Sequence, residues 1–159
     1  MITINGIKLG KTGFENQKIG DLLYFEGPLL SLFIDKYNPD VYYLYKWTDR
    51  NEAANRWLIT QVRTAELRHF FDKKVTLKAL LTKNPLTFIL DLDEKMKEKQ
   101  ILVCATDDIP KTYLPDGHSF FDENTFSPFA NNFKQVINKN RLDYLLKEMQ
   151  ELVGVKKAS

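Results

Sequence analysis

The pattern of hydrophobic and polar positions between residues 19 and 62 predicts an antiparallel sheet. Four runs rich in aromatic and β-branched residues are separated by short polar segments with turn chemistry, such as Gly27-Pro28 and Asn38-Pro39-Asp40. This arrangement is typical of a β-meander. The runs cover residues 19–25, 29–34, 41–48 and 55–62.

The next segment predicts two short helices and then two further strands. Leu67, Phe70 and Phe71 recur at helical spacing after Thr64, which is a good N-cap residue. A second helix is expected to begin at residues 75–76 and to end at residues 84–85. Two apolar runs follow at 85–92 and 100–106, joined by a charged hairpin tip, and residues 107–113 are expected to continue as an edge segment.

The last segment predicts C-terminal helices over residues 127–154. Ser127-Pro128 is a typical helix start, and Gly154 is a plausible stop. The helical pattern of apolar residues weakens around 138–140 and then resumes. The second group is Leu142, Leu145, Leu146, Met149, Leu152 and Val153. At the other end, residues 1–18 predict short strands or an extension, with Asn5-Gly6 as a hairpin turn.

This order of elements predicts an α+β fold: an antiparallel meander sheet of about five to six strands, with helices packed on one face. The 159 residues suit a single domain (1–159) with one core, and the hydrophobic content of 43% is sufficient to fill it. The pattern alone does not say which face the helices cover.

The near balance of basic and acidic residues excludes a strong electrostatic field over the whole protein. With 23 basic and 21 acidic residues, the formal net charge is +2, which does not favour nucleic acid or a membrane surface as a partner. The single cysteine, Cys104, lies in an apolar run and is expected to be buried. We find no signal segment and no apolar run of the ~18 residues that a membrane helix needs, so we expect a cytoplasmic protein.

Aromatic residues on neighbouring strands provide the strongest binding candidates. Strand alternation places Val41, Tyr43, Tyr45 and Trp47 on one face. If one sheet face is exposed, its rings form an anchoring surface for a protein partner. The predicted binding residues are Tyr43, Tyr45, Trp47, Arg50, Arg56 and Trp57. The alternative is ordinary core packing of these rings.

Acidic residues offer a weaker, catalytic alternative. Asp91, Asp93 and Glu94 follow an apolar strand, and the two aspartates share a face from which they could bind Mg²⁺ through water. The alternative is a solvated hairpin tip. The two histidines, His69 and His118, are isolated and predict no zinc site. The sequence therefore predicts no resident cofactor or metal.

The central stretch resembles an uncharacterised bacterial domain family, a domain of unknown function. The resemblance rests on residues 26–33 (EGPLLSLF), 43–49 (YLYKWTD) and 55–58 (NRWL), and it extends over roughly residues 22–115. Members of that family are small cytoplasmic proteins, so the resemblance implies one such domain and adds no catalytic motif.

Three functions follow as hypotheses. The first is a non-catalytic protein-interaction or accessory module, with self-association as one form and a toxin-immunity or phage-defence system as one setting. The second is a metal-dependent phosphoesterase or nucleotide-processing enzyme that uses the acidic residues. The third is a nucleic-acid-binding module using Lys46, Arg50, Arg56 and Arg63 beside Trp47 and Trp57.

Overall fold

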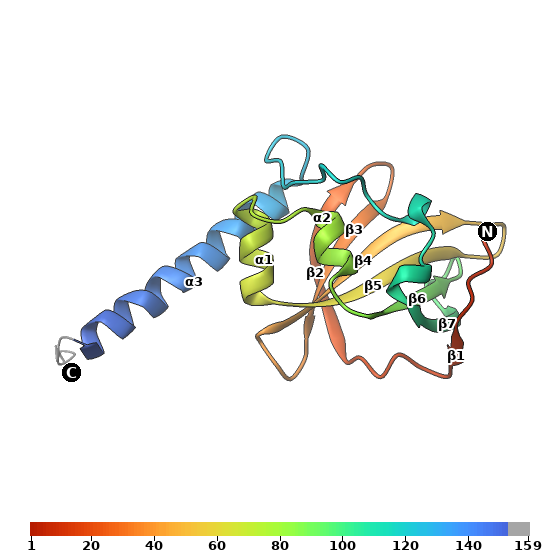
Figure 1. The fold of residues 1–159 in the computed structure, drawn as a ribbon, viewed down its shortest axis with the longest axis horizontal. Helices are drawn as coiled ribbons and strands as arrows, with labels where there is room; N and C mark the ends of the chain where they lie inside the picture. The colour runs from red at the N-terminus through yellow and green to blue at the C-terminus, as the bar shows by residue number, and fades with distance from the viewer. Residues whose placement is uncertain (153–159) are drawn as a thin grey trace.

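The computed structural model describes residues 1–152, and there it contains one seven-stranded antiparallel sheet (Figure 1). The strand order across the sheet is β1-β7-β6-β5-β4-β3-β2. The strands are β1 (Ile7–Leu9), β2 (Asn16–Tyr24), β3 (Pro28–Asp35), β4 (Val41–Arg50), β5 (Asn55–Arg63), β6 (Leu86–Leu92) and β7 (Glu98–Ala105).

The predicted antiparallel α+β fold is confirmed, but the strand number is seven rather than five to six. The extra pairing is made by β1, which adds to the outer edge of β7 with Ile7 opposite Val103. Asn5-Gly6 therefore does not turn a hairpin. Instead, Gly6 lies so close to β7 that a Cβ there would stand 2.8 Å from the Val103 carbonyl oxygen.

The link between β1 and β2 shows that the sheet is curled. These strands occupy opposite edges, and a flat sheet would separate them by about 29 Å at ~4.8 Å per strand. The chain from Leu9 to Asn16 spans at most about 24 Å when fully extended. The sheet must therefore curve around the face that this link crosses, and there Phe14 packs against Tyr43 and Phe88 with ring centroids 4.6 and 4.7 Å apart.

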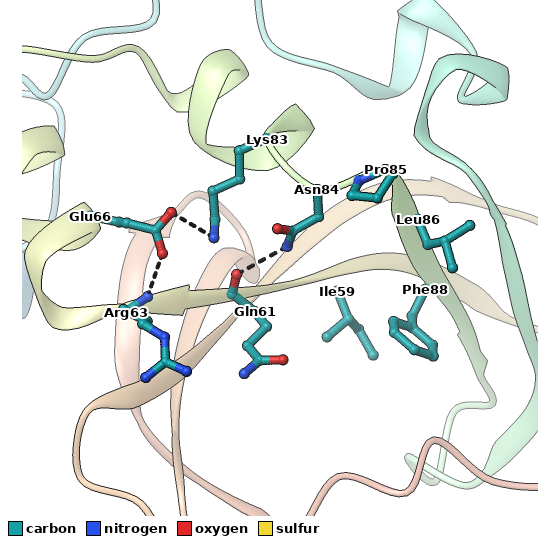
Figure 2. A pocket seen from close by; sticks show the side chains of 9 residues that line it. All are labelled: Ile59, Gln61, Arg63, Glu66, Lys83, Asn84, Pro85, Leu86 and Phe88. Carbon is teal, nitrogen blue, oxygen red and sulfur yellow. Dashed lines mark hydrogen bonds and ion pairs between the residues drawn. The ribbon is translucent and has the colours of Figure 1, made fainter.

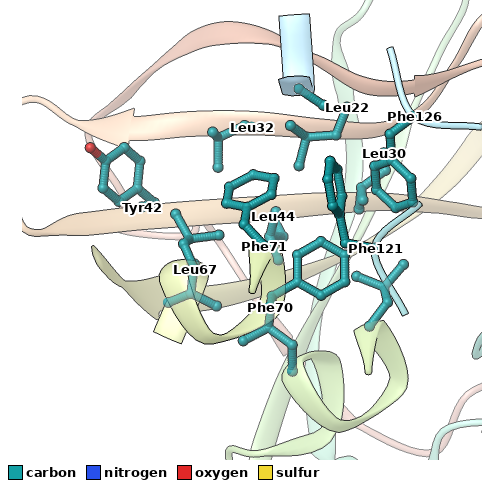
Figure 3. Close-up of a cluster of buried hydrophobic side chains, with 14 of the residues drawn as sticks. Leu22, Leu30, Leu32, Tyr42, Leu44, Leu67, Phe70, Phe71, Phe121 and Phe126 are labelled. Carbon is teal, nitrogen blue, oxygen red and sulfur yellow. The ribbon is translucent and has the colours of Figure 1, made fainter. Parts of the chain in front are cut away.

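The larger core lies between the opposite sheet face and the helices (Figure 3). Strand alternation directs Leu30, Leu32 and Leu44 to this side, where they meet the helical residues Phe70 and Phe71. Phe121 and Phe126, from the segment before the last helix, complete the cluster and make ring contacts with Phe70.

Two short helices connect β5 to β6. α1 (Thr64–Phe71) begins with Arg63, not Thr64, at its N-cap, where the Arg63 backbone N–H donates to the Glu66 carboxylate at 2.8 Å. α2 (Leu77–Thr82) begins as predicted, because the Thr76 hydroxyl accepts a hydrogen bond from the Ala79 N–H at 3.0 Å. The expected edge segment at 107–113 is instead a pair of 3-10 turns, η1 (Thr106–Asp108) and η2 (Lys111–Tyr113).

The C-terminal region is one continuous helix, α3 (Pro128–Leu152), in place of several. Ser127 starts it as predicted: its hydroxyl accepts from the Ala130 N–H and donates to the Asp21 carbonyl. The first turns of α3 pack on β2 and α1, whereas the rest projects beyond the sheet (Figure 1). The helices thus cover one face only in part. The predicted stop at Gly154 lies outside the described residues.

Gly20 allows α3 to approach β2. A Cβ at this position would lie 2.6 Å from ring carbons of Phe129, well inside contact distance. We predict that Gly20→Ala lowers the free energy of unfolding by about 1–3 kcal/mol, because the Phe129 ring must shift in a packed core. Urea denaturation followed by circular dichroism measures this. Gly10→Ala is the control, since a Cβ there meets nothing within 4 Å; equal effects of the two substitutions would refute the role of Gly20.

Candidate functional site

A buried ion pair joins β5 to β6. Arg56 and Asp91 face each other directly in the strand register, and each is only 4% exposed. Arg56 Nε donates to Asp91 Oδ1 at 2.8 Å, and Arg56 Nη2 donates to Asp91 Oδ2 at 2.9 Å. This two-pronged geometry is the strongest form of an arginine–carboxylate pair, and hydrogen bonding to the Asp91 carboxylate raises the pKa of Arg56.

Three further groups complete this polar network. Arg56 Nη1 donates to the Ile2 carbonyl at 2.6 Å and to the Tyr113 hydroxyl at 3.3 Å. The Tyr113 hydroxyl in turn donates to Asp49 at 2.8 Å and holds the pKa of that carboxyl below its usual range. Burial raises the pKa of Tyr113 itself. The network therefore ties the N-terminal segment and η2 to the central strands.

A cavity of about 540 Å³ opens beside this network. One wall is the N-terminal segment, and the other is formed by the loop after β4 and by β7. Arg56 and Asp91 contribute to its lining even though both are almost fully buried. The lining residues are Met1, Ile2, Thr3, Ile4, Asn51, Ala53, Ala54, Arg56, Asp91, Lys99, Gln100 and Leu102.

A second, smaller cavity of about 280 Å³ lies where β5 and β6 diverge (Figure 2). β6 pairs with β5 only as far as Ile59, so the end of β5 has β4 on one side and no strand on the other. Asn84 partly replaces that partner by donating to the Gln61 carbonyl at 3.3 Å. The charged groups at its rim are already paired, Lys83 with Glu66 and Arg63 with Asp40. This cavity therefore presents no free charge for a ligand.

The predicted aromatic surface is not an exposed face. Tyr43 and Trp57 are buried, and Tyr45 and Trp47 are half-buried. They belong to a second core cluster with Phe14, Ile59 and Leu90 on the concave side of the sheet. Burial, together with a hydrogen bond to Asp35, raises the pKa of Tyr43 to about 12. The interpretation as core packing therefore fits these rings better than the binding surface does.

Of the two arginines that are predicted to bind a partner, only Arg50 is exposed. Arg56 is buried in its ion pair with Asp91. The basic residues proposed for nucleic-acid binding do not converge either. Lys46 is half-buried and donates to the Trp47 carbonyl, and burial lowers its pKa. Arg63 pairs with Asp40.

The three predicted acidic residues have different contacts and do not form one site. Asp91 pairs with Arg56, whereas the Asp93 carboxylate accepts the backbone N–H groups of Lys95 and Lys97 in the hairpin turn. Glu94 is exposed at the tip. Among the residues whose side chains the structure describes, no three His, Cys, Asp or Glu are grouped as metal ligands would be. Cys104 is buried, as predicted.

No protein-family model, curated protein or solved structure matches this chain significantly. The resemblance to an uncharacterised bacterial family stays a prediction. None of the helices in the described part of the chain is long and apolar enough to span a membrane.

The projecting part of α3 exposes large apolar side chains. Leu146, Met149 and Leu152 are 47%, 60% and 84% exposed, although in the first half of the helix Ala130 and Ile137 are buried against the core. The three exposed residues recur every three positions, so they lie along one side of the helix. The sequence pattern contains this signal as the second group of apolar residues in the C-terminal segment, but helical spacing alone does not show whether such a stripe is covered.

Proposed function

We propose that this chain is a non-catalytic protein-interaction module that contacts its partner through the projecting part of α3. The observation that carries this proposal is the apolar stripe of Leu146, Met149 and Leu152, which the sheet does not cover. Exposed apolar residues gathered on one element favour a protein contact, because isolated ones are common on surfaces but contiguous ones are costly.

The geometry of the helix suits recognition in a groove. An amphipathic helix that binds a partner presents anchors at three- and four-residue spacing to an apolar groove. Its anchoring to β2 and α1 through residues such as Phe129 and Phe133 would hold such a helix in a fixed direction. Preorganisation of this kind reduces the entropy lost on binding.

The catalytic alternative has less support. The buried acidic residue that could serve it, Asp91, is neutralised by Arg56, and its neighbour Asp93 stabilises a turn. The metal-dependent enzyme, the nucleic-acid-binding module and the toxin-immunity or phage-defence setting all stay predictions.

We predict that Met149→Glu abolishes partner binding and leaves folding unchanged. Truncation of a central interface anchor costs 2 kcal/mol or more, which weakens binding about 30-fold, and a buried charge costs still more. Affinity capture of tagged protein from extract of the host, with quantitative mass spectrometry, measures the retained partner. Light scattering of the purified protein tests self-association in the same variants.

Asn140→Glu is the matched control. It adds the same charge to the same helix, and nine residues at 100° each place it on the side opposite Met149. The proposal expects this variant to retain the partner. Equal capture by wild type and Met149→Glu, or equal loss in both variants, would contradict a contact through the stripe.

A further inference from the structure

The cavity beside Arg56 and Asp91 is shaped by a β-bulge in β7. Asp91 of β6 pairs with Gln100, but the next residue, Leu92, pairs with Glu98, so Lys99 is the extra residue. Successive strand residues normally point to opposite faces. Lys99 and Gln100 nevertheless both line this cavity. The bulge therefore brings Lys99 to the cavity beside Gln100, and bulges commonly have this effect beside functional sites.

Among the charged side chains around the cavity, one cation is left unbalanced. Of the charged side chains that line it, Arg56 and Asp91 neutralise each other. Lys99 is exposed and forms no ion pair among the described residues. A net positive charge thus remains at the rim of a cavity whose floor consists of buried polar groups.

Hydrogen-bond donors that are not used within the protein are present at the same place. Arg56 has five N–H groups, and its bonds to Asp91, Ile2 and Tyr113 use four of them. Asn51 engages its side-chain oxygen with the N–H groups of Ala53 and Ala54, which leaves its NH₂ group to donate. The lysine ammonium adds three donors.

We propose that this cavity binds the oxyanion group, carboxylate or phosphate, of a small polar ligand, with Lys99 as its principal counter-charge. Donors from Asn51 and Arg56 orient the ligand, and the Arg56–Asp91 pair holds the floor of the cavity in place. This site is separate from the apolar stripe of α3, and it does not depend on the proposed protein contact.

The test is titration of the full chain with inorganic phosphate and, separately, with acetate, followed by ¹H–¹⁵N NMR. The expected result is that one probe shifts the amide signals of Asn51, Lys99 and Gln100 in a saturable manner. The probe that binds more tightly identifies which oxyanion the cavity accepts. Absence of saturable shifts with both probes would overturn the proposal.

Variants of exposed lysines separate a site from general charge attraction. Lys99→Ala is expected to weaken binding about tenfold, the loss of one charge-assisted hydrogen bond, and Lys99→Arg to retain most of the affinity. Lys97→Ala removes a neighbouring exposed lysine that does not line the cavity and should bind like wild type. Equal weakening by Lys97→Ala and Lys99→Ala would show a diffuse surface effect and contradict the assignment.

Discussion

Asp91→Ala lowers the free energy of unfolding by about 3–5 kcal/mol, because it leaves the guanidinium of Arg56 buried without its counter-charge. Arg56 is 4% exposed, so its guanidinium has little contact with water to compensate for the lost carboxylate. Urea denaturation followed by tryptophan fluorescence measures the change. Glu94→Ala, which removes an exposed carboxylate two residues beyond the same strand, should change stability by less than about 0.5 kcal/mol.

A double variant shows whether Asp91→Ala destabilises the protein through the unpaired charge of Arg56 or through lost packing. Arg56→Met with Asp91→Leu replaces both charges by apolar side chains and should recover most of the stability lost in Asp91→Ala. The bonds from Arg56 to Ile2 and Tyr113 are lost in this variant, so the N-terminal segment should show faster amide exchange. A cost of Asp91→Ala no larger than that of Glu94→Ala would refute the account of the pair.

Phe71→Ala is the second substitution with a large expected effect, about 3–5 kcal/mol of unfolding free energy. The Phe71 side chain is fully buried, and its ring meets Phe121 edge-on with centroids 5.0 Å apart (Figure 3). The centroid of the Phe133 ring lies 6.1 Å from that of Phe71. Removal of the ring opens a cavity between α1, α3 and the sheet. The same urea experiment measures the loss of stability.

Phe120→Ala provides the comparison, since Phe120 is 44% exposed next to the buried Phe121. Its expected cost is below about 1 kcal/mol, in line with partial burial. If both substitutions destabilised the protein equally, the helix-side cluster would not be the principal core.

The sequence predicts the central strands and the start of α2 and α3 well, for local reasons. Each strand from β3 to β6 coincides with an apolar run bounded by turn residues, and the strand faces follow from alternation. Thr76 and Ser127 accept N–H groups of the first turn, as cap residues do. These signals lie within a few residues of the elements that they determine.

The remaining differences arise from contacts between distant segments. β1 joins β7 about ninety residues later, which local pattern cannot indicate, and Phe14 covers the second sheet face from a polar segment. The aromatic strands consequently have cores on both sides, and the expected exposed ring surface is absent from the described residues.

The ion pair was partly visible in the sequence. Asp91 is the only charged residue of β6, and Arg56 stands directly before the apolar run Trp57-Leu58-Ile59 in β5. A charge in such a position needs an opposite charge nearby. Local pattern does not show that β5 pairs with β6, so the sequence alone points Arg56 to a binding role and Asp91 to a catalytic one. Tyr113, which completes the network, lies in a 3-10 turn that the pattern assigned to an edge segment.

The central claim is that the projecting part of α3 is the contact element, and site-specific photocrosslinking in host cells tests it most directly. A photoreactive residue is placed at Met149 in one variant and at the exposed Glu151, on the other side of the helix, in a second. The account predicts a discrete crosslinked protein, or a crosslinked second copy of this chain, from position 149 and little from position 151. Absence of a crosslink at 149, or equal crosslinking at both positions, would contradict it.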